Sequence, residues 1–151
     1  MKFIADSMLG RLTRWLRLSG YDVFYAKDLK DEEILEKAEQ EERILLTRDK
    51  KLTENADSVG VAYSLIRGNG LLEQLRQLTG EQDILVHDTP EVSRCPLCNS
   101  KVKAVAKENV KERVPDSVFQ VFEEFWICED CGKIYWHGGH WKKIKDMVMQ
   151  I

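Results

Sequence analysis

All four cysteines of this 151-residue chain lie between residues 95 and 131 and form two Cys-x-x-Cys pairs, Cys95 with Cys98 and Cys128 with Cys131. A Cys-x-x-Cys turn presents two thiolates to one ion, and two such turns complete the tetrahedral sulfur shell that zinc prefers. Each pair is followed by a residue that tolerates a left-handed backbone, Asn99 or Gly132. The spacing therefore predicts a zinc ribbon over residues 94–151.

Two other arrangements of these cysteines remain open from the sequence: a pair of disulfides, or a redox-active dithiol. A reducing cytoplasm opposes structural disulfides, and a redox dithiol needs only one Cys-x-x-Cys pair. The 29 residues between the pairs exceed the usual spacing of about 15–20, which a longer strand pair or an inserted short helix would explain. Because four cysteines fill the zinc shell, we expect a structural ion, with any catalysis elsewhere.

Residues 1–85 alternate short apolar runs with segments of helical periodicity. The expected strands are 2–5, 22–25, 43–47 and 59–66, and the expected helices are 9–19, 31–42, 50–56 and 71–78. This order predicts an α/β fold, in which a small parallel sheet is flanked by helices through right-handed crossovers.

Residues 86–93 have no clear period, and we interpret them as a linker between the α/β domain and the ribbon. In the ribbon, strands are expected near 102–106, 125–127 and 133–136, and helices near 115–121 and 140–151.

The composition is that of a globular protein, with 43% hydrophobic and 32% charged residues. No apolar run approaches the ~18 residues of a membrane span, and Asp6 falls where a signal-peptide core would have to form. We therefore expect a cytoplasmic protein with no membrane partner. The net charge is −4 for residues 1–90 and +1 for residues 91–151. A nucleic-acid partner would thus need a local basic stripe or bound cations.

Three aspartates are expected at one edge of the sheet. Asp6 follows the first strand, Asp49 follows the third, and Asp31 begins the helix after the second. Ligands of parallel sheets bind at the carboxyl ends of the strands, and Asp31 is in phase with the apolar Ile34 and Ala38, so it should point inward. Clustered carboxylates repel one another unless a cation such as Mg²⁺ or Mn²⁺ joins them. The pattern indicates metal-dependent hydrolysis of a phosphodiester or phosphomonoester.

Each aspartate also has a structural interpretation. Asp31 and Asp49 are suited to capping the helices that they begin, whereas Asp6 ends a buried strand and is harder to explain without a function.

Basic residues lie next to these positions. Arg11, Arg14 and Arg17 recur every three residues along the first helix, and form either a phosphate-backbone track or a solvated face. Arg48, beside Asp49, is better placed for a reacting phosphate.

Several ordered segments of the chain resemble the Mut-seven C-terminal domain family. They are 3–12 (FIADSMLGRL), 15–18 (WLRL), 31–35 (DEEIL), 43–49 (RILLTRD), 94–99 (RCPLCN) and 135–140 (YWHGGH). Each is short, but jointly they are specific and span nearly the whole chain.

The resemblance implies a PIN-like fold fused to a zinc ribbon, and ribonuclease activity. It further implies that Asp6, Asp31 and Asp49 match the acidic positions of a PIN-like site. Other PIN nucleases usually carry a fourth acid after the third. The sequence offers only Asp57, which precedes the fourth strand instead of following one.

Together these features predict a Mg²⁺- or Mn²⁺-dependent ribonuclease that cuts single-stranded RNA. Asp6, Asp31 and Asp49 would hold the metal, while Arg48, with Arg11 or Arg14, would steady the phosphate. The zinc ribbon would position RNA or a protein partner, on free RNA or on a ribosome or other ribonucleoprotein. Two rivals remain: a non-catalytic RNA- or ribosome-binding adaptor that retains the fold, and a small-molecule phosphatase.

Overall fold

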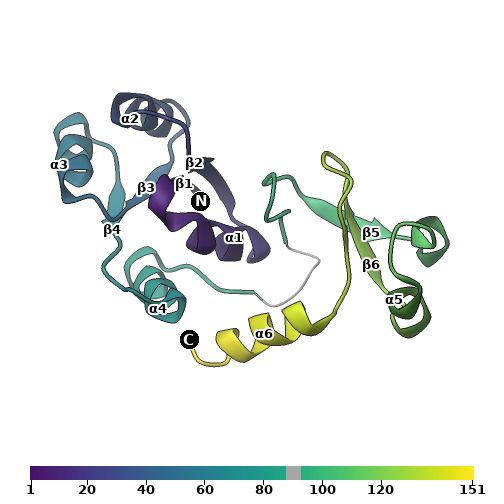
Figure 1. The fold of residues 1–151 in the computed structure, drawn as a ribbon. Helices are drawn as coiled ribbons and strands as arrows, with labels where there is room; N and C mark the ends of the chain where they lie inside the picture. Colours follow the sequence, from purple (N-terminus) through teal and green to yellow (C-terminus); the bar gives the residue numbers. More distant parts are fainter. Residues whose placement is uncertain (88–92) are drawn as a thin grey trace.

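The structure is a computed structural model that describes residues 1–87 and 93–151, apart from the side chain of His140. Its first part contains strands β1 (Lys2–Asp6), β2 (Asp22–Ala26), β3 (Ile44–Thr47) and β4 (Tyr63–Leu65). The helical elements there are η1 (Ser7–Leu9), α1 (Gly10–Leu18), α2 (Asp31–Gln40), α3 (Lys50–Val59) and α4 (Leu71–Gln82) (Figure 1). The expected alternation of strands and helices is confirmed.

The four strands form one parallel sheet in the order β2-β1-β3-β4. In the plane of the sheet, β2 lies on one side of β1 and β3 lies on the other, so the direction in which strands are added reverses after β2. Right-handed crossovers place α1 on one face of the sheet and α2 and α3 on the other. The carboxyl ends of β1 and β3 therefore flank the switch point, where open α/β sheets bind their ligands.

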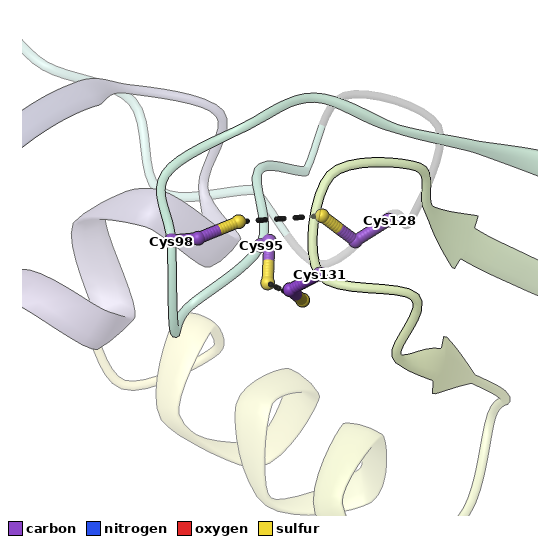
Figure 2. Close-up of side chains that lie close together, drawn as sticks. All are labelled: Cys95, Cys98, Cys128 and Cys131. Atoms are coloured by element: carbon purple, nitrogen blue, oxygen red, sulfur yellow. Dashed lines mark hydrogen bonds between the residues drawn. The ribbon is translucent and has the colours of Figure 1, made fainter.

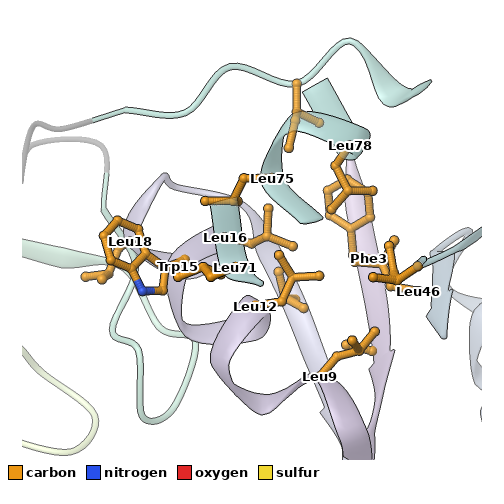
Figure 3. Close-up of a cluster of buried hydrophobic side chains, with 14 of the residues drawn as sticks. Phe3, Leu9, Leu12, Trp15, Leu16, Leu18, Leu46, Leu71, Leu75 and Leu78 are labelled. Atoms are coloured by element: carbon orange, nitrogen blue, oxygen red, sulfur yellow. The ribbon is translucent and has the colours of Figure 1, made fainter. Parts of the chain in front are cut away.

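The larger core lies on the face covered by α1 and α4. Phe3 and Leu46 point to this face from the sheet, and leucines of both helices pack over them (Figure 3). The opposite face buries Ile4 and Leu45 against α2 and α3. The alternation of neighbours along β1 and β3 between the two cores follows from the two-residue period of a strand.

The C-terminal part is a three-stranded antiparallel sheet in the order β5 (Val102–Val105), β6 (Phe125–Cys128) and β7 (Ile134–Tyr135). Between β5 and β6 lie η3 (Lys107–Val110) and α5 (Asp116–Val121), which account for the long spacing between the cysteine pairs. Val110, Val114 and Phe125 form a small core beneath them.

The last helix, α6 (Gly139–Val148), follows the ribbon in the chain but packs on the α/β part (Figure 1). Its Trp141 and Ile144 are buried in the same core as Trp15, Leu71 and Leu75. The α/β core is thus completed by a segment that comes after the ribbon.

Buried polar contacts join the first cysteine turn to α1 and β2. The Arg17 guanidinium donates to the carbonyl oxygen of Val23 from Nε and Nη2 at 3.0 and 2.8 Å, and to that of Pro96 from Nη1 at 3.0 Å. Asn99 Oδ1 accepts from the Val23 N–H at 3.0 Å, and its Nδ2 donates to Asp22 Oδ1 at 2.8 Å. Both backbone groups of Val23 on this edge strand are therefore paired.

Some element boundaries differ from the prediction. The helix expected at 50–56 continues to Val59, because Gly60 ends it with φ of +76°, and β4 begins only at Tyr63. The helix expected to stop before Gly80 continues to Gln82, whose Nε2 donates to Ser64 Oγ at 2.8 Å. Among the described residues, no helix combines the length and apolar character needed to cross a membrane.

We expect Arg17→Met to lower the free energy of unfolding by about 2–3 kcal/mol, because the carbonyls of Val23 and Pro96 lose a charged donor. Urea denaturation followed by circular dichroism measures the change. Arg14→Met, at an exposed position of the same helix, is the matched control and should differ from the parent by less than about 0.5 kcal/mol. Equal losses in both variants would contradict the role given to Arg17.

Candidate functional site

The four cysteines converge between the two turns that carry them (Figure 2). All their sulfur atoms lie within 4.8 Å of one another, with Cys95 and Cys131 3.6 Å apart and Cys98 and Cys128 3.3 Å apart. A tetrahedral ion with Zn–S bonds of about 2.3 Å separates its sulfurs by about 3.8 Å. The donor set and its spacing fit a zinc ion, and no disulfide joins these residues.

The backbone after each pair has the predicted conformation. Asn99 has φ of +73° and Gly132 of +76°, so both occupy the left-handed region. Two sulfur contacts, Cys95 with Cys131 and Cys98 with Cys128, join one turn to the other, which fits an ion shared by both turns.

The thiols interact strongly with one another. Burial and thiol hydrogen bonds raise the pKa of Cys128 to about 12. For Cys98, burial is outweighed by hydrogen bonds from Ser100 and Cys128, and the pKa falls to about 7. A cation bound here would displace the protons that the thiols now share.

His137 has a structural role in the ribbon. Its ring stacks on Trp126 with centroids 5.0 Å apart and contacts Trp141 at 5.6 Å. It therefore links β6 to α6.

At the other candidate site, Asp6 is a nearly buried carboxylate, 7% exposed, at the carboxyl end of β1. Its Oδ1 accepts from the Met8 N–H at 3.0 Å, and its Oδ2 accepts a short hydrogen bond from the Thr47 hydroxyl. Because strand positions alternate, Asp6 lies on the α2 and α3 face of the sheet together with Ile4.

Thr47 connects Asp6 to Asp49. Its buried hydroxyl oxygen donates to Asp6 and accepts from the Asp49 N–H at 3.0 Å. The Asp49 side chain is exposed and caps α3, accepting from the N–H groups of Lys51 and Leu52 at 2.9 and 3.4 Å. The structural interpretation of Asp49 is therefore correct, and the same contacts hold it at the switch point beside Asp6.

Asp31 does not point inward as predicted. It is the first residue of α2 and its side chain is exposed. Nor does it cap α2: Glu33 does, through its Oε2, which accepts from the Lys30 N–H at 2.7 Å. Within 1–87 and 93–151, the cysteines are the only group of three or more potential metal ligands with all ligand atoms within 4.8 Å of one another. The three aspartates do not form so tight a group.

Asp57 is poorly placed to be the fourth acid. It lies on α3 eight residues after Asp49, about 12 Å further along a helix that runs away from this edge. The loop after β4, residues 66–70, contains no acid at all.

Arg48 reaches the loop after β4. Its Nη1 donates to the Gly68 carbonyl oxygen at 2.6 Å and its Nη2 to Asn69 Oδ1 at 3.0 Å. Arg48 and Arg11 both line a cavity of about 380 Å³ at this end of the sheet. Arg11 and Arg14 are exposed, whereas Arg17 is buried at the ribbon, so the predicted three-arginine track loses its third member.

The family model described as the Mut7-C RNAse domain matches residues 1–148. The chain belongs to this family. The match extends over the parallel sheet, the cysteine turns and α6, so the RNAse-domain description applies to both parts of the molecule. No curated protein and no solved structure gives a significant match.

Two further residues of this Mut7-C chain lie at the candidate site although the sequence did not single them out: Thr47 and Lys27. Thr47 is a polar residue at the end of the buried strand β3, two positions after Leu45, so it lies on the same face of the sheet as Asp6. This two-residue spacing from Leu45 was the feature of the sequence that could have indicated Thr47. Lys27 follows the end of β2 and lines a cavity with Arg11 and Arg14.

We expect Cys98→Ser to lose zinc, because three thiolates and a hydroxyl bind the ion far more weakly than four thiolates do. Zinc content by atomic absorption should fall from one ion per chain in the parent to well below one. Lys101→Ala, at an exposed non-ligand position three residues after Cys98, should keep its zinc. Stoichiometric zinc in Cys98→Ser would contradict the four-cysteine site.

Proposed function

We propose that this chain is a divalent-metal-dependent ribonuclease that hydrolyses RNA phosphodiester bonds at the carboxyl edge of its parallel sheet. One observation supports this above the others: the nearly buried Asp6 is tied through Thr47 to Asp49 at the switch point. A buried carboxylate is costly, and within residues 1–87 and 93–151 the Asp6 carboxylate accepts hydrogen bonds only from the Met8 N–H and the Thr47 hydroxyl. A cation would offset that cost.

The donor set fits Mg²⁺ or Mn²⁺. Such ions are usually held by one or two carboxylates, with water and substrate phosphate completing the octahedron, so a closed cage is not required. Asp6 and Asp49 would supply the direct ligands. Asp31, whose carboxylate has no hydrogen bond or ion pair within the described residues, would act through water from the first turn of α2.

The protein groups have distinct parts in the proposed reaction. When bound, the cation supplies a water of lowered pKa and neutralises charge on the phosphoryl group. Thr47 fixes the orientation of Asp6, and Arg48, itself fixed by Gly68 and Asn69, contacts the phosphate. Arg11 contacts the next phosphate across the 380 Å³ cavity. The ribbon's zinc is structural in this proposal, and the protein acts on cytoplasmic RNA, free or in a ribonucleoprotein.

A second candidate function is a non-catalytic RNA- or ribosome-binding adaptor. The exposed Asp31 and the absence of a fourth acid in the loop after β4 favour it. The adaptor would bind RNA without cleaving it and would need no Mn²⁺.

We expect the parent to cleave labelled single-stranded RNA in Mn²⁺, and Asp6→Asn and Asp49→Asn to lose at least about 100-fold in kcat, because each removes a metal ligand. Gel analysis of the products measures the rates. Asp57→Asn, which changes an exposed aspartate of α3 away from the site, is the control and should be as active as the parent. Equal cleavage by Asp6→Asn and the parent would exclude this site. RNA binding with no cleavage and no Mn²⁺ site by calorimetry would favour the adaptor.

We expect Thr47→Val to raise the Mn²⁺ concentration needed for half-maximal activity by about 10–100-fold, since Asp6 loses the hydroxyl that orients it. Thr47→Ser keeps the hydroxyl and should restore the parent's metal dependence. A merely structural threonine would instead change stability, measured by thermal melting, without changing the response to Mn²⁺.

A further inference from the structure

A cleft of about 630 Å³ separates α1 from the zinc ribbon, outside the acidic site described above. Arg14 and Trp15 of α1 form one wall, and Leu97 of the first cysteine turn and Trp136 after β7 form the other. Its volume falls in the range of about 300–1,000 Å³ that is typical of ligand-binding clefts.

We propose that this cleft binds single-stranded RNA and places the strand for cleavage at the carboxyl edge of the sheet. The inference deepens the proposed ribonuclease function and rests on RNA being its substrate. Three observations support it: the charge of the lining, its aromatic surface and its continuity with the acidic edge.

All charged side chains that line the cleft are cations: Arg11, Arg14, Lys133 and Lys143. None of them makes an ion pair or hydrogen bond within the described residues, whereas Lys37, Arg43 and Lys107 each pair with an acid. The chain has 26 acidic residues and 23 lysines and arginines, so a random part of its surface would contain about as many acids as cations. The lining of this cleft, with four unpaired cations and no acid, differs from that expectation. Such a lining suits a polyanion.

The cleft also offers flat apolar surface. Tyr135 and Trp136 are half-buried, and Leu97 is 54% exposed. Gly138 lets the chain fold against Trp136, because a Cβ at this position would lie 3.0 Å from the indole nitrogen. Aromatic faces beside cations are the means by which proteins bind unpaired bases, each stack contributing about 1–3 kcal/mol. This combination favours a single strand over a duplex, whose bases are already stacked on one another.

The cleft connects with the acidic edge through α1. Arg11 and Arg14 also line a 600 Å³ cavity that includes Lys27, the residue after β2, and the last residue of β2 pairs with Asp6. Arg11 further lines the 380 Å³ cavity with Arg48. None of the three linings contains an acid. The exposed face of α1 is thus a basic wall between the acidic edge and the ribbon.

The test measures the affinity of the full-length zinc-loaded chain for a fluorescent 12-nucleotide oligouridylate, by anisotropy. An Asp6→Asn background, assayed without added Mg²⁺ or Mn²⁺, prevents cleavage and leaves the ribbon's zinc in place. We expect the double variant Lys133→Gln with Lys143→Gln to weaken binding at least 10-fold. The slope of the logarithm of the binding constant against the logarithm of the salt concentration should become shallower by about 0.7 per lysine. Trp136→Leu, which keeps an apolar side chain, should weaken it about 5- to 100-fold through lost stacking.

The matched control is Lys142→Gln with Lys145→Gln, two exposed lysines of α6 that do not line the cleft. It removes the same charge from the same region and should change affinity less than 2-fold. Zinc content and circular dichroism establish that every variant is folded. Two results would overturn the cleft as a single-strand site. One is equal weakening of oligouridylate binding by the two lysine-pair variants. The other is that the cleft variants weaken binding of a 12-base-pair duplex RNA as much as they weaken binding of the oligouridylate.

The cleft and the proposed ribonuclease function fail in different ways. Oligouridylate binding that depends on Lys133, Lys143 and Trp136 supports the cleft even if the parent never cleaves RNA, and the protein is then an adaptor. Cleavage that depends on Asp6, with unchanged affinity in the cleft variants, overturns the cleft and leaves the ribonuclease function intact. Displacement of the oligonucleotide by a polyglutamate peptide at equal charge would show a general acidic-peptide site instead and would also overturn the proposal.

Discussion

The buried guanidinium of Arg17 is the contact on which the relation between the two parts of the molecule depends. It bonds a carbonyl of the edge strand β2 and a carbonyl of the first cysteine turn, and the Arg94 N–H adds a bond of 2.7 Å to the Arg17 carbonyl oxygen. Burial lowers the pKa of Arg17, although the nearby cysteines and Asp22 oppose that change. A buried guanidinium is costly unless its donors are satisfied, and the donors of Arg17 are satisfied by carbonyls from both parts of the molecule.

The fold was predictable from local patterns to a large extent. Alternating apolar runs indicated the parallel sheet, and the cysteine spacing indicated the ribbon, because both signals lie within a few residues of the groups that they position. Arg17 shows where this approach fails. Its exposed appearance on a helical wheel is overridden by carbonyls at positions 23 and 96, and no period in the sequence reports a contact 79 residues away.

The candidate acidic site likewise contains residues whose positions the sequence predicted and residues whose positions it did not. Asp6 and Asp49 could be placed from topology, because the ends of β1 and β3 flank the switch point. Asp31 is exposed although its phase with Ile34 and Ala38 predicted an inward side chain, because it lies at the very start of α2, where helical phase alone does not determine burial. Thr47 was missed because a threonine at a strand end is common, and its role depends on the partner that the sheet places beside it.

The position of α6 has a consequence for how the chain matures. Trp141 and Ile144 complete a core whose other members, such as Trp15 and Leu75, are synthesised much earlier. During translation these apolar side chains remain uncovered until the ribbon has emerged and α6 can return to them, an interval in which a nascent chain is prone to association. Folding of the ribbon brings the start of α6 close to its destination, because β7 ends at Tyr135 and α6 begins at Gly139. The core of the α/β part is therefore completed only after the whole ribbon has been synthesised, although that part contributes no cysteine to the cluster.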